Sequence, residues 1–213
     1  VLLVGLGCSG YIVQNRDKIL PISYDSYPAR NFSDDFADGA SLFMSPEGIF
    51  GMPIYIDPLV MYWNKDIFST GGVANYPTKW SEFENLASRL TISDRSGNIS
   101  QATVALGSYI NIESAKDILS ALIMQTGNEL VRFSKQDETD NFGAKVPYIV
   151  SLGGFDDNSG PESALRFFLD FSNPARKAYS WNVAMPNSKL AFSSGALAIY
   201  IGHASDYRSI QKI

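Results

Sequence analysis

The stretch Gly51–Phe68, GMPIYIDPLVMYWNKDIF, decides the fold that we predict for this chain. Near its start, isoleucines alternate with Tyr55 and Asp57, and a period of two is typical of a half-buried strand. The unbroken apolar run Leu59–Trp63 predicts a strand buried on both faces. Between these segments, Pro58 has no N–H to donate to a neighbouring strand, so pairing is expected to stop there. Such an interrupted strand predicts a crossing between two lobes.

Tyr55 and Asp57 are two residues apart in this segment, so their side chains are expected on the same side. An aromatic face beside a carboxylate suits a ligand that carries hydroxyl groups. Both residues are therefore candidate ligand-binding residues.

The composition bounds the classes of function. The chain has 213 residues, of which 45% are hydrophobic and 18% charged, so it can bury a core. A net charge of −5 with no basic cluster argues against nucleic acid as a partner. One cysteine and one histidine argue against an internal disulfide and against metal sites built on these residues, and we expect no cofactor. No apolar run approaches the roughly 20 residues that cross a bilayer.

Residues 5–10, GLGCSG, spell G-x-G-x-x-G, and Asp25 follows about 20 residues later, which is the pattern of a dinucleotide-binding turn. Pro21 comes too early for the expected helix and second strand. Two further interpretations stay open: a lipoprotein signal with Cys8 as the lipidated residue, or a plain strand followed by a glycine turn.

Alternating strand-like and helix-like segments predict an α/β fold. Strands are expected at 102–107, 147–152 and 197–202, the last of them central and buried. Helices are expected near 31–38, after 64, over 78–90 with Thr78 as N-cap, over 115–126, from 161 to about 171, from 187 or 188 to 195, and from 205 onward.

Ligands gather where strands of an open α/β sheet end, and this selects further candidate residues. Asn111 lies in the loop before the helix over 115–126, and His203 follows the strand over 197–202. Flat aromatic faces that could contact a sugar ring occur near predicted strand ends as well, among them Trp181 and Tyr207.

Three ordered motifs then carry a family resemblance: G-x-P-x-x-x-D-x-L-x-x-Y-W-N-K-D-x-F from Gly51, P-T-x-W-x-E-F from Pro77, and a Y-x-W-N run from Tyr179 that extends to Gly195. From about Asp17 to Ile213 the chain resembles the extracellular solute-binding proteins of sugar ABC transporters, of the maltodextrin-binding type. The resemblance implies a periplasmic-binding-protein-like two-lobe fold (type II), present in part.

In that fold, residues 1–57 would be the end of a first lobe and residues 58–213 most of the second, in a fragment that lacks both ends. The resemblance also places Asp57 at the lobe crossing, and Tyr207 is the nearest aromatic to the place where the family has a sugar-stacking tryptophan.

The function implied is carbohydrate capture between lobes and delivery to a membrane permease. The protein would be an extracytoplasmic monomer, lipid-anchored if Cys8 is lipidated, and not an enzyme. A sensor or receptor domain of the same fold is the first alternative, and a nucleotide-cofactor enzyme that uses the G-x-G-x-x-G at residues 5–10 is the second. A glycosidase would need two carboxylates that face one bond, and a hydrolase a nucleophile beside a base; neither pattern is evident around the single histidine.

Overall fold

The computed structural model describes residues 16–128, 130–133, 148–150 and 159–211. The chain divides into two compact units, Val1–Ile56 and Asp57–Ile213. The division falls one residue from the lobe boundary expected at 57/58; the assignment of the units to lobes stays a prediction. The glycine motif at 5–10 and Cys8 lie outside the described residues.

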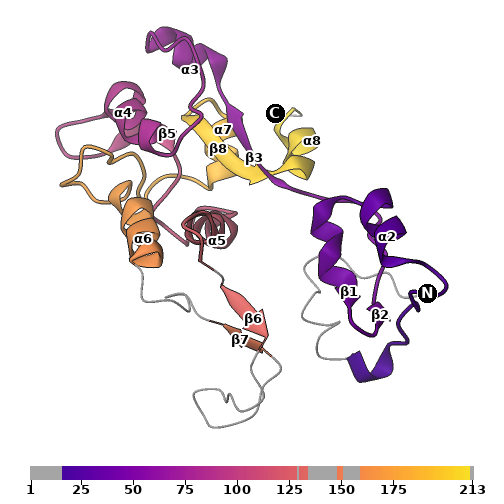
Figure 1. Ribbon diagram of the computed structural model, residues 1–213. Coiled ribbons are helices and arrows are strands. Elements are labelled where there is room, and N and C mark those ends of the chain that lie inside the picture. The colour runs from indigo at the N-terminus through magenta and orange to yellow at the C-terminus, as the bar shows by residue number, and fades with distance from the viewer. Residues whose placement is uncertain (1–15, 129, 134–147, 151–158, 212–213) are drawn as a thin grey trace. The chain divides into compact units, whose positions relative to one another are not determined.

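The unit Val1–Ile56 has a small core of three buried residues, Phe32, Ala40 and Ile49, against which several aromatic side chains pack. Figure 1 shows its helices and short strands. Its elements are η2 (Arg16–Lys18), α2 (Ala29–Asp35), η3 (Asp38–Phe43), β1 (Met44–Ser45) and β2 (Gly48–Ile49), with β1 antiparallel to β2. Phe32 is fully buried, and Phe36 and Phe43 pack against it. The helix expected near 31–38 therefore exists, two residues earlier, and it supplies this core.

The unit Asp57–Ile213 is built on a four-stranded sheet of order β3-β8-β5-β4. The strands are β3 (Leu59–Trp63), β4 (Ile92–Ser93), β5 (Ile99–Val104) and β8 (Leu197–His203). Strand β8 runs antiparallel to β3, with Tyr62 opposite Tyr200, and parallel to β5, with Val104 opposite Ile199. The prediction that residues 197–202 form a central buried strand is confirmed.

The segment before β3 is not the strand that its alternation predicts. No strand lies between Ile49 and Leu59, residues that the structure describes throughout, and Ile54 is 73% exposed. The register explains this: Leu59 pairs with His203, the last residue of β8, and the chain then turns into η4 (Ala204–Asp206). Residues before Leu59 have no partner strand on β8. Strand β3 is half-buried because it lies at the end of the strand order, so the expectation of burial on both faces is wrong.

Helices surround this sheet: α3 (Lys65–Thr70), α4 (Ser81–Leu90), α5 (Ala115–Gln125), α6 (Gly160–Asp170), α7 (Ser188–Ser193) and α8 (Tyr207–Ile210). Helix α4 packs on β5, α7 packs on β8, and α5 lies beside α6 (Figure 1). The short strands β6 (Val131–Phe133) and β7 (Tyr148–Val150) form a separate antiparallel pair.

Two of the expected helix starts can be checked at atomic detail. Asn187 caps α7, since its side chain accepts a hydrogen bond from the N–H of Lys189 at 2.9 Å. Helix α4 begins three residues after Thr78, and there the Glu82 carboxylate accepts from the N–H of Thr78 at 2.7 Å. The acid of the first turn therefore caps this end, and the predicted Thr78 cap is wrong.

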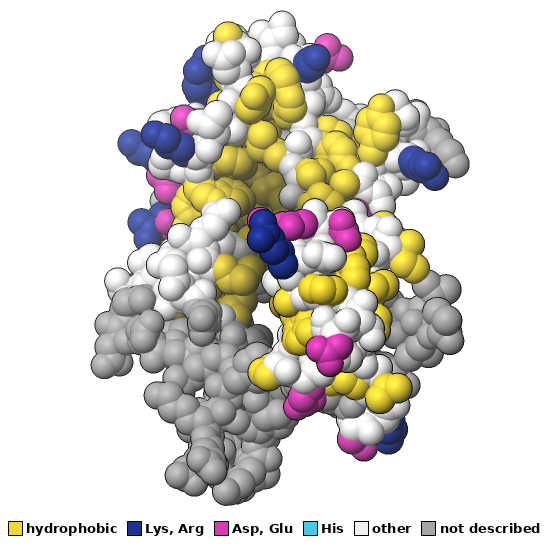
Figure 2. All heavy atoms as spheres, turned by 45° about the vertical axis from the view of Figure 1, so that its right-hand side comes forward, with side chains coloured by type: hydrophobic (Ala, Val, Ile, Leu, Met, Phe, Trp, Pro, Cys, Tyr) yellow, Lys and Arg dark blue, Asp and Glu magenta, His cyan; other side chains and the backbone are white. Residues whose placement is uncertain are grey.

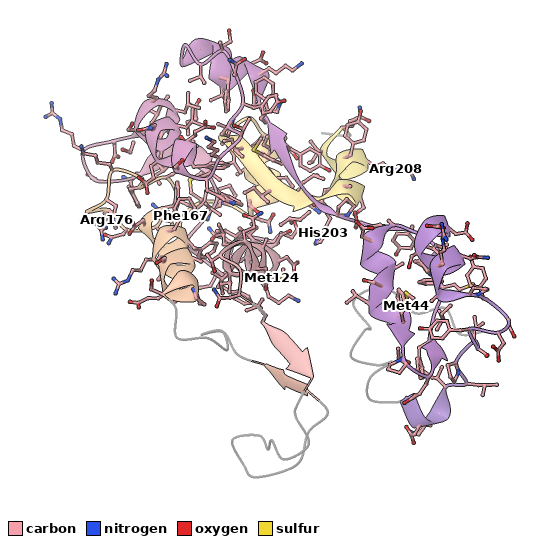
Figure 3. All side chains as sticks on the ribbon, viewed as in Figure 1. Met44, Met124, Phe167, Arg176, His203 and Arg208 are labelled. Carbon is pink, nitrogen blue, oxygen red and sulfur yellow. The ribbon has the colours of Figure 1, made fainter. Side chains whose placement is uncertain are left out.

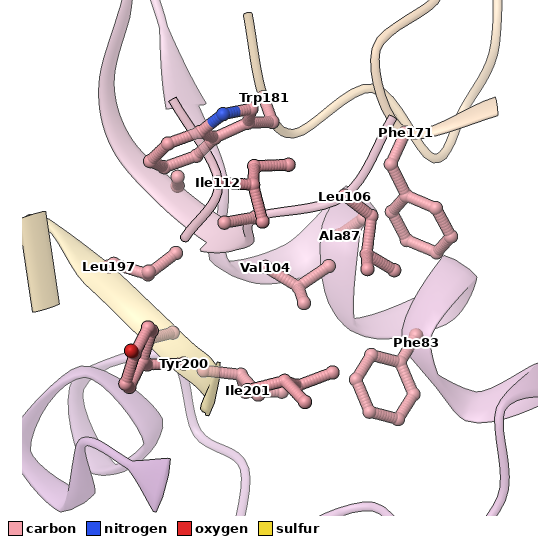
Figure 4. Close-up of a cluster of buried hydrophobic side chains, with 14 of the residues drawn as sticks. Phe83, Ala87, Val104, Leu106, Ile112, Phe171, Trp181, Leu197, Tyr200 and Ile201 are labelled. Atoms are coloured by element: carbon pink, nitrogen blue, oxygen red, sulfur yellow. The ribbon is translucent and has the colours of Figure 1, made fainter. Parts of the chain in front are cut away.

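The core of the unit joins the sheet to the helices (Figure 4). Its fully buried large side chains include Trp181, Tyr200 and Phe171. On the face shown in Figure 2, hydrophobic, acidic and basic side chains are interspersed. None of the described helices is both long and apolar enough to cross a membrane.

Candidate functional site

The loop between β5 and α5 starts at a glycine that no other residue could replace without strain. Gly107 has φ of +87°, and a Cβ there would lie 2.8 Å from the backbone nitrogen of Ser172. Left-handed backbone of this kind favours glycine. Residues 108–113 then lead to Ser114, the N-cap of α5.

This loop and the first turn of α5 form a hollow of about 330 Å³. It is lined by Tyr109, Ile110, Ile112, Glu113, Lys116, Asp117 and Asn187. Tyr109 is 79% exposed and Ile110 is 84% exposed. An aromatic ring, aliphatic surface, two carboxylates, an ammonium and an amide in one hollow match a ligand with apolar C–H faces and hydroxyl groups.

The Glu113 carboxylate of this hollow has a cationic partner, Lys189. The Lys189 Nζ is 3.3 Å from Oε1 of Glu113 and 2.7 Å from Oδ1 of Asp206. The hydrogen bond to Asp206 is the main reason why the pKa of Lys189 lies above its ordinary value. Burial alone would raise the pKa of Asp206, but Lys189 and the Tyr200 hydroxyl hold it below its usual range. The pair stays charged at neutral pH.

His203, labelled in Figure 3, is held between two acceptors at the carboxyl end of β8. Its Nδ1 is 3.1 Å from the backbone carbonyl oxygen of Asp57, and its Nε2 is 3.4 Å from Oδ2 of Asp117. Because a carbonyl and a carboxylate accept hydrogen bonds, both contacts are satisfied when both ring nitrogens donate, as they do in the imidazolium form. Burial lowers the pKa of His203, but these acceptors outweigh it and the net shift is upward.

The carboxylate of Asp57 is engaged by the turn that follows β8. The N–H of Ser205 donates to Oδ1 at 2.8 Å, and the Ser205 hydroxyl donates to Oδ2 at 2.6 Å. The pKa of Asp57 is lowered, first by the hydroxyl and then by the N–H of Ser205. The N–H of Ala204 also donates to the carbonyl of Pro58 at 2.9 Å. Asp57 therefore anchors the start of its unit to the end of β8.

Two tyrosines support this turn from the sheet. The Tyr200 hydroxyl donates to Oδ2 of Asp206 at 2.7 Å, and the Tyr62 hydroxyl donates to the carbonyl of His203 at 2.8 Å. Their rings stack with centroids 5.7 Å apart. Gly202 makes room for this arrangement, since a Cβ there would lie 2.4 Å from the Tyr200 ring.

The structure brings Asn111 and Trp181 together, and places both in the core. Trp181 is fully buried and donates its Nε1–H to Oδ1 of Asn111 at 3.0 Å. The Asn111 amide donates to the carbonyls of Asn182 and Met185, both at 2.9 Å. Because these bonds occupy the Asn111 side chain, its neighbours in the loop line the hollow instead. Ligand contact by Asn111 or Trp181 stays a prediction.

The other expected site residues are placed as follows. Asp57 and His203 lie together through the Nδ1 contact described above. Tyr207 is 54% exposed on α8, and its hydroxyl accepts from Nε2 of Gln211 at 2.6 Å. Tyr55 is 70% exposed and belongs to the unit Val1–Ile56. Neither tyrosine is among the residues that line the hollow.

Sequence reasoning missed Glu113, Asp117 and Lys189. A signal was present for the first two: Glu113 and Asp117 flank the start of an amphipathic helix, beside a loop already expected to meet ligand. Lys189 carried no such signal, because it comes from a distant helix. Among the described residues, no cluster of three or more His, Cys, Asp or Glu side chains could hold a metal ion.

The comparisons with known proteins agree with this architecture. A family model described as bacterial extracellular solute-binding protein matches residues 15–212, so the chain belongs to this family. It is a family of transporter binding proteins rather than of enzymes. Comparison with curated protein sequences gives no significant match.

Three solved structures show the same fold at low sequence identity. An ABC substrate-binding protein from Listeria monocytogenes in complex with cycloalternan is 17% identical with a TM-score of 0.60, over 94% of this chain and 47% of its own. An ABC transporter solute-binding protein from Thermotoga lettingae bound with α-D-tagatose is 16% identical with a TM-score of 0.59, over 96% of this chain and 48% of its own. UgpB from Mycobacterium tuberculosis in complex with glycerophosphocholine is 14% identical with a TM-score of 0.60, over 93% of this chain and 44% of its own.

The fold is thus the two-lobe fold of periplasmic solute-binding proteins, present in part. The chain spans about half the length of the solved structures it matches.

Proposed function

We propose that this chain captures a carbohydrate as the solute-binding component of an ABC transporter and passes it to a membrane permease. The observation that carries the proposal is the hollow of about 330 Å³ with Tyr109, Glu113 and Asp117 on its wall. Two of the three solved structures above hold a carbohydrate, cycloalternan or α-D-tagatose. The family description supports an extracytoplasmic location, outside the cell or in the periplasm.

Capture is proposed to work by lobe closure, with residues 1–57 and 58–213 as parts of the two lobes. The connecting stretch Gly51–Pro58 is the candidate hinge, since no strand pairs it and the boundary of the two units falls within it. A ligand that contacts both lobes favours the closed form by its extra affinity for that form. Tyr55 is proposed as a ligand contact from this stretch.

A thermal-shift panel tests the proposal on the chain of residues 1–213. A ligand that binds only the folded form at 100 times its dissociation constant raises the free energy of unfolding by about 2.7 kcal/mol, so it raises the melting temperature. We expect maltose, D-tagatose or other neutral sugars to raise it, without chemical conversion of the sugar.

Two variants show whether the sugar occupies the hollow. Glu113→Ala should remove the shift, and Glu84→Ala is the matched control, because Glu84 is an exposed acid on α4 and does not line the hollow. If amino acids or peptides raise the melting temperature and no carbohydrate does, the proposal that the ligand is a carbohydrate is wrong. A carbohydrate shift that survives Glu113→Ala unchanged would move the site elsewhere.

A further inference from the structure

The carboxylates that line the hollow lie near cationic side chains, one of which, Lys189, is shared with Asp206. Glu113 has Lys189 at 3.3 Å. Asp117 has Lys116 at 3.7 Å on one carboxylate oxygen and His203 at 3.4 Å on the other. Each carboxylate of the lining thus has a cationic partner. A ligand with a net charge would gain little there, whereas a neutral one with hydroxyl groups finds acceptors that are already compensated.

Lys189 differs from Lys116 in how firmly it is held. The Lys116 side chain is 79% exposed, while that of Lys189 is 26% exposed. Lys189 also contacts Asp206, whose side chain is only 13% exposed. Asp206 itself accepts hydrogen bonds from the Tyr200 hydroxyl at 2.7 Å and from the N–H of His203 at 3.1 Å. The ammonium of Lys189 is therefore held by Asp206 of η4, which is itself hydrogen-bonded to Tyr200 and His203 of β8.

The backbone around Lys189 and Glu113 is joined as well. The Ser188 hydroxyl accepts from the N–H of Glu113 at 3.2 Å, and the N–H of Ser188 donates to the carbonyl of Asn111 at 2.9 Å. These bonds tie the first turn of α7 to the loop that forms the hollow. Lys189 can thus set the position of the Glu113 carboxylate without contacting the ligand.

We propose that Lys189 is a positioning residue that determines specificity: it fixes and neutralises Glu113, so that the hollow selects a neutral polyhydroxylated ligand over a cationic one. The inference rests on the proposed function and deepens it. Without the ammonium, the Glu113 carboxylate keeps its charge but loses its partner. A neutral ligand that covers the unpaired Glu113 carboxylate then loses affinity, because it removes water from an uncompensated charge. The ammonium of a cationic ligand can take the place of the missing Lys189.

The experiment compares D-glucose with D-glucosamine, which carries an ammonium in place of one hydroxyl, and adds maltose and D-tagatose as further neutral probes. Affinities are measured by titration calorimetry at pH 7 and low salt for the wild type, Lys189→Met, Lys189→Arg and the control Lys177→Met. Lys177 is exposed and lies outside the lining of the hollow.

We expect Lys189→Met to lower the affinity for the neutral sugars about fivefold, which is the upper end for the loss of a partly exposed ion pair. The ratio of the glucosamine affinity to the glucose affinity should rise. Lys189→Arg should retain the wild-type preference, and Lys177→Met should change nothing. In a Glu113→Gln background, Lys189→Met should no longer change the preference between glucose and glucosamine, because that change requires the Glu113 charge. The lost contact with Asp206 is common to both backgrounds.

The outcomes separate the two proposals. If the wild type binds a neutral sugar and Lys189→Met matches Lys177→Met, the role of Lys189 is overturned while the proposed function stands. The role of Lys189 is also overturned if Lys189→Met lowers the affinities for glucose and glucosamine by the same factor. It is overturned as well if Lys189→Met changes the preference between the two sugars as much in the Glu113→Gln background as in the wild type. A merely structural role of Lys189 would give either result. If the wild type binds no sugar of the wider panel, the proposed function falls, and this inference with it.

Discussion

Two polar clusters of the unit Asp57–Ile213 use similar chemistry in opposite surroundings. In the first, Asn111, Trp181 and Ser180 are buried in the core and hydrogen-bonded to one another or to backbone. In the second, Glu113 and His203 are partly exposed at the end of the sheet and paired with charged or carbonyl groups. The comparison teaches that burial decides whether a polar group belongs to the fold or stays available to a ligand. Substitutions should therefore affect stability strongly in the first cluster and weakly in the second.

The largest effect on stability is expected from Asn111→Ala. It removes three hydrogen bonds and leaves the Trp181 N–H and two carbonyls without their partner in a buried position. At about 1–3 kcal/mol for each unsatisfied buried group, with partial relaxation, the free energy of unfolding should fall by about 3 kcal/mol. Urea denaturation measures it, with the exposed Asn75→Ala as control. A loss as small as that of the control would contradict the assignment of Asn111 to the core.

A smaller loss is expected from Ser180→Ala. The Ser180 hydroxyl oxygen accepts from the N–H groups of Thr103 at 2.8 Å and Val104 at 3.0 Å, at the buried end of β5. Removal leaves backbone donors unpaired and should cost about 2 kcal/mol. The matched control is Ser88→Ala, an exposed serine on α4. Equal urea midpoints for the two variants would show that β5 needs no such support.

In the exposed cluster, Asp57→Asn should cost at most about 1 kcal/mol at pH 7, because solvent screens its bonds to Ser205. The folded-state pKa of Asp57 is depressed, so its contribution is present above the unfolded value and is lost as pH falls through the folded one. The difference in free energy of unfolding between wild type and variant should therefore shrink toward low pH. A difference that is constant between pH 7 and pH 3 would refute this.

The smallest effect is the pH dependence that His203 supplies. Its folded-state pKa is raised, so its stabilisation is complete below the unfolded value of about 6.5 and is lost as pH rises through the folded value. Wild type should lose its small advantage over His203→Gln as pH rises above about 6.5. His203 is the single histidine, so its imidazole resonance reports the pKa directly by NMR. A titration midpoint below 6.5 would contradict the two-acceptor geometry.

Much of the fold could be predicted because local patterns and packing agree. The apolar run at 197–202 became the central strand β8, and the helical spacing of apolar residues after Ala115 became α5. The strand predicted before Leu59 is absent, although the structure describes residues 50–58 throughout. Alternation of apolar and polar residues indicates which side chains a strand would bury, but a strand also needs a neighbouring strand to pair with. Strand β8 ends at His203, so Ile54 and Tyr55 are left exposed.

The sequence predicted which loop carries the candidate site, but not which of its side chains line the hollow. The sequence places a ligand site beside the start of α5, and the hollow lies there. The sequence pointed to Asn111 as the ligand contact, yet Glu113 and Asp117 line the hollow. The side chain of Asn111 instead accepts the hydrogen bond of the Trp181 N–H in the core. Two residues apart on a loop, polar side chains can turn to opposite sides, and only packing against α7 and residues 181–185 selects which.

By itself the sequence determined the alternation of strands and helices and the central strand, because apolar periodicity and turn residues act over short distances along the chain. The family of solute-binding proteins came from the resemblance of its motifs. The tertiary structure alone decided that Lys189 meets Glu113 and that His203 meets Asp57 and Asp117. His203 is 146 residues from Asp57 and 86 residues from Asp117 along the chain, and no local pattern encodes a distance in space between such partners. Their positions follow from how α5, α7 and β8 pack on one another.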